Sequence, residues 1–162
     1  MEKSNVMRLL EARGIAYEAF SFSPEIHSAR GVAEVLGVPA HIVYKTLVVV
    51  SPEGRPFLVL IPGNRELDLR RLARSLGLKK VRMATQKEAE RWTGLQVGGI
   101  SPLALLGRGF RVYVDRSALD LEHIFVSAGR RGLNLRLRVS DLLALTAARP
   151  VEASAEGGGV EE

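Results

Sequence analysis

The sequence predicts a single domain of mixed α/β class, with helices around a curved mixed sheet. Its 162 residues suffice for one domain with a sizeable core. Hydrophobic residues make up 46% of the chain and charged residues 25%, which is the balance of an ordinary globular protein. Short apolar runs typical of strands, about seven in all, are interspersed with amphipathic segments typical of helices.

In the N-terminal part, capping residues and glycines mark the ends of two helices. Ser4 and Ser28 are placed to cap the helices, and Gly14 and Gly37 are placed to end them. The alternation of apolar and polar residues between these helices predicts a strand. The expected elements are a helix over residues 4–13, a strand over 15–22 and a helix over 28–36.

A hairpin and two more helices are expected next. Two apolar runs are separated by the turn signal Ser-Pro-Glu-Gly-Arg at residues 51–55, which predicts a hairpin at the centre of a sheet. Thr85 and Glu88 fit a capping box. The expected elements are strands over 43–50 and 57–61, a helix over 67–76, a short strand over 79–83 and a helix over 85–92.

The C-terminal part is expected to contain three strands and a last helix, followed by a tail. The strands cover 111–115, 124–126 and 133–139, one helical turn covers 117–121, and Ser140 caps a helix over 141–146. Residues 150–162 combine small residues, four glutamates and three consecutive glycines, a composition that predicts disorder. The folded domain is therefore expected to cover residues 1–149.

Composition excludes several classes of protein. The chain has no cysteine, so it has no disulfides, no thiolate zinc site and no cysteine nucleophile. His27, His41 and His123 lie far apart without metal-ligand spacing, and no phosphate loop or dinucleotide fingerprint is present. We therefore expect neither a metal nor a cofactor. The first residues lack the pattern of a signal peptide, and the apolar runs are too short to span a bilayer. Both features predict a cytoplasmic protein.

The body of the chain is basic. The net charge is +5, from 23 basic and 18 acidic residues, and four of the acidic residues lie in the expected tail. A body this basic favours a polyanionic partner such as RNA. The alternative is a soluble, arginine-rich protein whose composition reflects its genome or a hot habitat.

Lys45 is the one charged residue in the run Val-Tyr-Lys-Thr-Leu-Val-Val-Val at residues 43–50. A run this short and this rich in valine predicts a strand buried on both faces. An ammonium group there loses much of its hydration unless something pairs with it, so Lys45 is a candidate functional residue. The alternative is a side chain that reaches out to water at the entrance of the strand.

Two glycine-containing loops are candidate ligand-binding segments. Residues 98–102 read Gly-Gly-Ile-Ser-Pro, and Gly98 and Gly99 let backbone amides approach an anion or a developing oxyanion. Residues 127–132 read Ser-Ala-Gly-Arg-Arg-Gly, in which small residues allow close approach and arginines suit phosphate. For each loop the alternative is an ordinary tight turn.

These stretches together resemble the YbaK/EbsC family. The matching segments, in order and spacing, are 43–47, 67–69, 77–81, 97–103 and 126–133. The sequence looks closest to the Cys-tRNA(Pro) deacylases, and it is also similar to the editing domain inserted in bacterial prolyl-tRNA synthetases. The resemblance covers about residues 3–148.

The resemblance implies a compact domain with a central barrel-like mixed sheet. It implies hydrolysis, in trans, of the ester that joins a wrong amino acid to tRNA, with cysteine on tRNA(Pro) as the first candidate. The implied partner is mischarged tRNA rather than DNA or a membrane, and prolyl-tRNA synthetase is a further candidate partner. Because such an ester is already activated, the attacking group can be water or the substrate's own thiol or ribose hydroxyl.

The resemblance also implies roles for individual residues. In the family, the lysine that matches Lys45 is essential for deacylation, and the glycines that match Gly98 and Gly99 line the pocket for the reacting carbonyl. Family residues that match Tyr17, Thr46 and Ser127 are further pocket candidates. The loops and the start of the second helix add the expected substrate contacts His27, Ser28, Ser101, Gly129 and Arg130.

One segment departs from the deacylase pattern. Before the second helix, the best-known members carry an aromatic residue that shapes the amino-acid pocket, whereas this chain has His27, Ser28 and Ala29. The edited amino acid can therefore also be alanine, serine or threonine. Two alternatives from other classes are a tRNA- or synthetase-binding module without catalysis and a basic domain that binds a small molecule.

Overall fold

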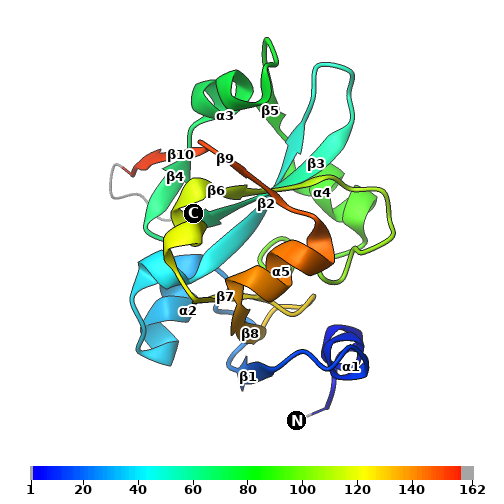
Figure 1. The fold of residues 1–162 in the computed structure, drawn as a ribbon, viewed down its shortest axis with the longest axis vertical. Coiled ribbons are helices and arrows are strands. Elements are labelled where there is room, and N and C mark those ends of the chain that lie inside the picture. The colour runs from blue at the N-terminus through cyan, green and yellow to red at the C-terminus, as the bar shows by residue number, and fades with distance from the viewer. Residues whose placement is uncertain (1, 158–162) are drawn as a thin grey trace.

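Five strands form the main sheet of the computed structural model, which describes residues 2–157 (Figure 1). In spatial order the strands are β5 (Arg82–Met83), β2 (Tyr44–Val50), β3 (Pro56–Pro62), β6 (Val112–Asp115) and β9 (Arg149–Val151). The β2–β3 hairpin and the β2–β5 pair are antiparallel, whereas β3–β6 and β6–β9 are parallel. The expected mixed sheet with a central hairpin is therefore confirmed.

Two smaller sheets flank the main one. The strands β1 (Tyr17–Ser21), β8 (Leu133–Arg138) and β7 (His123–Ser127) form an antiparallel sheet, and β4 (Arg65–Leu67) pairs with β10 (Ser154–Glu156). A single bridge between Val43 and Phe125 joins β7 to the start of β2. The sheets do not close on one another, so the mixed α/β class is confirmed and the barrel-like description is not.

The helices surround these sheets and begin mostly where capping residues predict. They are α1 (Asn5–Ala12), α2 (Ala29–Leu36), α3 (Leu69–Leu76), α4 (Gln86–Thr93) and α5 (Val139–Thr146), with short 3₁₀ turns η1 (Ala40–Ile42) and η2 (Arg116–Asp120). Ser4, Ser28 and Thr85 each accept a hydrogen bond from the backbone of their helix. The predicted Ser140 cap is wrong: β8 runs directly into α5, so Arg138 takes the capping position without a side-chain bond.

The prediction of a disordered segment from Pro150 onward is wrong as far as Glu156. Strand β9 adds to the edge of the main sheet, and β10 pairs with β4, a strand that the sequence pattern does not predict. Val151, Ala153 and Ser154 are buried, and Arg65 donates two hydrogen bonds to Ser154. Small residues suffice here because the strands are held by backbone pairing and by an arginine from the partner strand. Residues 158–162 lie outside the described residues.

The two faces of β2 pack into different parts of the core. Tyr44 and Val48 belong to the large cluster that includes α1, β7 and β8, whereas Val49 packs with Phe57 and Leu72 beneath α3. Val49 is fully buried, but Lys45 at the other end of the strand is only half-buried. The prediction of a strand buried on both faces therefore holds for its second half, and the first half borders a cavity.

Candidate active site

A cavity of about 150 Å³ lies at the N-terminal end of β2. Four parts of the chain that are distant in sequence form its walls: the start of α2, the start of β2, the loop before Ile100, and the facing ends of β7 and β8. The lining is largely apolar. Its residues are His27, Ser28, Ala29, Val32, Val43, Tyr44, Lys45, Thr46, Leu47, Val97, Gly98, Ile100, Ser127 and Asn134.

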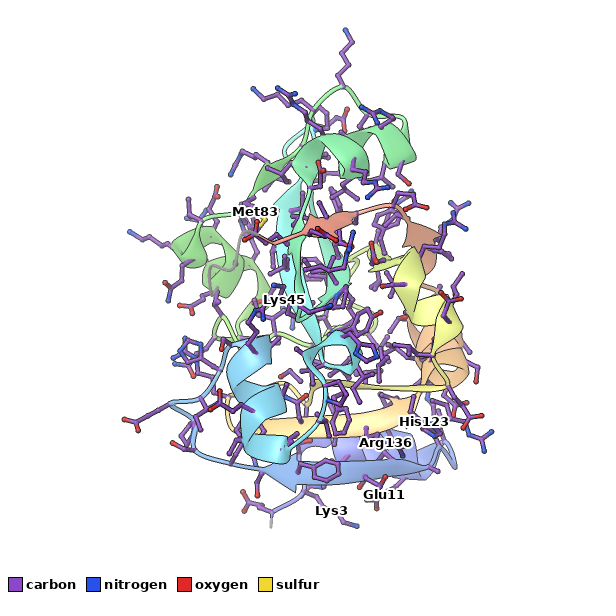
Figure 2. All side chains as sticks on the ribbon, turned by 90° about the vertical axis from the view of Figure 1, so that its left-hand side faces the viewer. Lys3, Glu11, Lys45, Met83, His123 and Arg136 are labelled. Atoms are coloured by element: carbon purple, nitrogen blue, oxygen red, sulfur yellow. The ribbon has the colours of Figure 1, made fainter. Side chains whose placement is uncertain are left out.

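Lys45 brings the one ammonium group to this cavity. Figure 2 shows Lys45 near the middle of the molecule, beside α2. Its Nζ atom is shielded from solvent, so the alternative of a side chain that reaches out to water is wrong. Thr46 Oγ1 is also buried, and it has no hydrogen-bond partner among residues 2–157. A cation in an apolar cavity attracts a negative charge more strongly than it would in water.

The backbone at Gly98 requires glycine. Its φ of +93° disfavours L side chains, and a Cβ atom there would lie 2.5 Å from Cβ of His27. The loop is held on both sides: Glu90 Oε2 accepts a hydrogen bond from the Val97 N–H, and Arg131 Nε donates to the Val97 carbonyl, each at 2.8 Å. These two side chains fix the Gly98 backbone against the cavity.

Gly99 does not contribute an amide to the cavity. Its N–H donates to the Gln96 carbonyl at 2.8 Å within the turn, and Gly99 does not line the cavity. A Cβ atom here would lie 2.7 Å from the Arg130 carbonyl carbon, so close packing explains this glycine. Of the two glycines expected to line the pocket, only Gly98 lines the cavity, and its N–H has no acceptor among residues 2–157.

The facing strands add two polar residues. Ser127 lines the cavity as expected, and its Oγ accepts a hydrogen bond from the Gly129 N–H at 3.2 Å. Asn134 was not anticipated as a site residue. It is 6% exposed, and its Oδ1 has no hydrogen-bond partner among residues 2–157. One feature of the sequence could have pointed to Asn134. Along β8 every second residue is polar, and Asn134 is neutral whereas the other two, Arg136 and Arg138, are charged.

Four of the expected substrate contacts lie outside this cavity. Tyr17 donates a hydrogen bond to the Glu11 carboxylate, and this bond raises the pKa of Tyr17 to about 12. Ser101 is fully buried and accepts a hydrogen bond from the Leu103 N–H. Gly129 and Arg130 line a separate groove, of about 570 Å³, beside the start of α1. His27, Ser28, Thr46 and Ser127 therefore remain as the expected contacts that reach the cavity.

A chain of hydrogen bonds runs from Tyr44, at the cavity, to the C-terminal strands. The Tyr44 hydroxyl lies 2.8 Å from Ser117 Oγ, which donates to Asp115 Oδ2 at 2.5 Å. Because Ser117 gives its proton to Asp115, Tyr44 is the donor to Ser117. Asp115 Oδ1 accepts from the Ala153 N–H, so this chain of bonds reaches the C-terminal strands. Burial raises the pKa of Tyr44 to about 12, so its phenol stays protonated well above neutral pH.

The chemical groups of the cavity suit stabilisation of negative charge. One ammonium group, one backbone N–H and several hydroxyl or amide groups line it, and no described carboxylate does. No group of three or more His, Asp or Glu side chains within residues 2–157 is arranged to hold a metal ion. The site can therefore bind a polarised carbonyl or a phosphate, while the described walls offer no carboxylate as a base.

Comparison with known proteins assigns the family. Residues 23–145 match the model of the aminoacyl-tRNA editing domain. The chain belongs to this family. It is 40% identical over 147 residues to EbsC of Enterococcus faecalis, described as a candidate Cys-tRNA(Pro)/Cys-tRNA(Cys) deacylase, with 90% of this chain and 89% of EbsC covered. These matches confirm the resemblance and the expected class of activity, aminoacyl-tRNA deacylation.

Two further similar proteins are a prolyl-tRNA synthetase and a protein described as acting for one. A proline–tRNA ligase of Nitratidesulfovibrio vulgaris is 35% identical over 114 residues, which are 70% of this chain and 20% of the ligase. The crystal structure of a candidate trans-editing enzyme for prolyl-tRNA synthetase superposes with a TM-score of 0.80 at 26% identity, covering 95% of this chain and 99% of that one. None of the helices described between residues 2 and 157 has the length and apolar character to cross a bilayer. The cytoplasmic location stays a prediction.

Proposed function

We propose that the protein hydrolyses the aminoacyl ester of mischarged tRNA, with Cys-tRNA(Pro) as the main substrate, in the cavity at Lys45. The observation that carries this proposal is the small cavity in which the Lys45 ammonium group and the Gly98 backbone come together. A volume of about 150 Å³ suits a small amino-acid side chain. The largely apolar lining of the cavity favours a cysteine side chain over a charged one.

In the reaction, the attacking oxygen or sulfur adds to the ester carbonyl carbon and the carbonyl oxygen becomes negative. The Gly98 N–H and the Lys45 ammonium group are the groups in the cavity that stabilise this charge. The bond to the ribose oxygen then breaks, and that oxygen takes a proton to regenerate the tRNA hydroxyl. If water attacks, the free amino acid is released directly. If the cysteine thiol attacks, a thiolactone forms first and water opens it.

The proton acceptor is proposed to come from the substrate. No carboxylate among residues 2–157 lines the cavity, and His27 lies at its exposed rim beside Gly98. The α-amino group, the ribose hydroxyl and the cysteine thiol are the titratable or nucleophilic groups that the substrate itself carries. The aminoacyl ester is already activated, so its hydrolysis depends more on stabilisation of the developing negative charge than on a strong base. A cavity without a carboxylate suits such a reaction.

The start of α2 supports a second candidate substrate set. His27, Ser28 and Ala29 form one wall, and their small or polar side chains leave room for alanine, serine or threonine as well. A pocket of this kind discriminates by only about 1–3 kcal/mol per methylene group. The proposed partner for tRNA selection is prolyl-tRNA synthetase, because a structural relative is described as its trans-editing enzyme.

A deacylation panel tests the proposal. The wild-type protein is incubated with tRNA(Pro) charged with cysteine, alanine, serine or proline, and the remaining ester is followed with time. We expect rapid loss of the cysteinyl ester and slow loss of the prolyl ester. Loss of the alanyl or seryl ester instead assigns the second substrate set. Retained tRNA binding without hydrolysis of any ester would identify a binding module and overturn the proposed reaction.

A further inference from the structure

A second groove lies at the end of β2 that is remote from Lys45. It has a volume of about 750 Å³ and lies between the β2–β3 turn, the end of α3 and the segment before β6. Figure 1 shows α3, β5 and the tip of the hairpin at one end of the molecule, with α1 and β1 at the other. Lys45 and Ser51 are six residues apart along extended chain, so the groove lies about 20 Å from the cavity.

Three exposed arginines border this groove. Arg55 comes from the hairpin turn, and Arg108 and Arg111 come from the segment before β6. None of the three side chains has a hydrogen-bond or ion-pair partner among residues 2–157, whereas Arg82 at the same end pairs with Glu88. Glu53 is the one carboxylate that lines the groove within the described chain. The groove therefore carries more positive than negative charge, and none of its three arginines is ion-paired within the described residues.

The floor of the groove is apolar and partly aromatic. Phe57 and Tyr113 contact each other edge to face with ring centroids 5.5 Å apart, and Phe110, Leu76 and Leu78 complete the floor. Phe110 and Tyr113 are only half-buried, so part of their surface faces the groove. A ligand for this surface has to combine a flat apolar group with negative charge.

A nucleotide unit of RNA has this combination. Guanidinium groups bind phosphate through two parallel hydrogen bonds, and bases pack on aromatic and apolar side chains with little dependence on sequence. We propose that this groove binds a tRNA segment remote from the ester, so that the protein holds tRNA at two places about 20 Å apart. This inference rests on the proposed function, since it takes tRNA as the substrate. An acidic protein surface is the competing occupant, but it would leave the aromatic floor without a matching group.

The test uses a charge-matched pair of triple variants of the full chain. One variant carries Arg55→Ala, Arg108→Ala and Arg111→Ala; the control carries Arg8→Ala, Arg13→Ala and Arg138→Ala, which remove the same charge from exposed positions outside the groove. Binding of deacylated tRNA is measured by fluorescence anisotropy from 50 to 200 mM salt. Each phosphate contact contributes a slope of about one to the plot of log affinity against log salt.

The groove variant is expected to lose about three from this slope and about tenfold or more in affinity at 50 mM salt, while the control changes far less. Equal affinity and equal slope in the two variants would overturn the proposal. Unchanged tRNA binding together with lost binding of prolyl-tRNA synthetase would overturn it in favour of a protein partner.

Kinetics separate this inference from the proposed function. For full-length Cys-tRNA(Pro), the groove variant is expected to raise KM about tenfold and leave kcat unchanged, because its arginines do not touch the ester. For the cysteinyl 3′-terminal trinucleotide, both variants should react like wild type. A matching loss with the trinucleotide would contradict the inference. If even the wild-type protein hydrolyses no ester, the proposed function fails, and the tRNA-binding comparison alone decides the role of the groove.

Discussion

At the scale of single residues, the conformation of Gly98 makes the clearest prediction. Gly98→Ala would place a Cβ atom 2.5 Å from Cβ of His27 on a backbone with φ of +93°. Gly107→Ala is the matched control, because φ is +77° there and no atom lies within 4 Å of the added Cβ. Backbone strain should destabilise both variants by about 1–2 kcal/mol, and the clash with His27 should add a further loss of stability to Gly98→Ala alone.

Only Gly98→Ala should also lower the deacylation rate, by about tenfold or more, because the His27 wall and the loop must move apart. Thermal unfolding and single-turnover deacylation of both variants measure the two effects. Equal rates in the two variants would show that the Gly98 backbone does not take part in the reaction.

Tyr44 predicts a specific alkaline loss of stability. Its pKa is raised to about 12 in the folded protein, from the 10.0 that is ordinary for tyrosine. The unfolded chain therefore gives up this proton first, and the stability that Tyr44 contributes is complete below pH 10 and is lost between pH 10 and 12. Tyr44→Phe removes this titration, so its free energy of unfolding should fall less steeply over that range than that of wild type.

Tyr44→Phe also removes the hydrogen bond to Ser117, which should cost about 1 kcal/mol at neutral pH. Urea unfolding of both proteins at several pH values measures both effects. The pKa of Tyr17 is also raised, but Tyr17 is present in both proteins and its contribution cancels in the comparison. Parallel pH profiles would contradict the assignment to Tyr44.

At the scale of elements, α4 positions the glycine loop through one carboxylate. Glu90 Oε2 accepts the Val97 N–H at 2.8 Å, one residue before Gly98. Glu90→Ala should lower the deacylation rate several-fold and destabilise the protein by about 1 kcal/mol. Glu34→Ala on the exposed side of α2 is the control and should change neither quantity. A Glu90→Ala rate equal to that of wild type would show that Arg131 alone holds the loop.

Local signals predict some elements and leave others undetectable. Ser28 and Gly37 bracket α2 as expected, because a side-chain cap and a left-handed glycine are local features that the sequence spells out. The strands β4, β9 and β10 have three residues each and little hydrophobic pattern of their own. These strands form because partner strands and arginine side chains complete their backbone hydrogen bonds. The partners are distant in sequence, so no single segment predicts the pairing.

The same distinction applies to the site. Lys45 is a candidate because a cation within a valine-rich run is anomalous by itself, and Ser127 is a candidate because it matches a pocket residue of the resembled family. Asn134 reaches the cavity only because β8 lies beside β7. Gly98 and Gly99 differ in role because the turn directs the Gly99 N–H to the Gln96 carbonyl, away from the cavity. Those facts are set by tertiary packing, so the sequence alone assigned both glycines the same role.

At the scale of the whole molecule, the C-terminal strands close the side of the main sheet. Val151 and Ala153 are buried beneath α3, and Asp115 accepts the Ala153 N–H. Deletion of residues 149–162 should therefore lower the free energy of unfolding by several kcal/mol, since it exposes an apolar cluster and leaves Asp115 without that donor. Val151→Ala should cost about 1–3 kcal/mol by the same mechanism. Unchanged urea midpoints in both variants would contradict the role of these strands.

The most direct test of the account is single-turnover deacylation of Cys-tRNA(Pro) by wild type and by Lys45→Met, which keeps the length of the side chain and removes its charge. The folded state of each protein is checked by its urea midpoint, and tRNA binding is measured in parallel. If the cavity at Lys45 is the reaction site, the variant stays folded and binds tRNA, but its rate falls by about a hundredfold or more. A folded Lys45→Met variant that deacylates at the wild-type rate would contradict the account and move the reaction to another part of the protein.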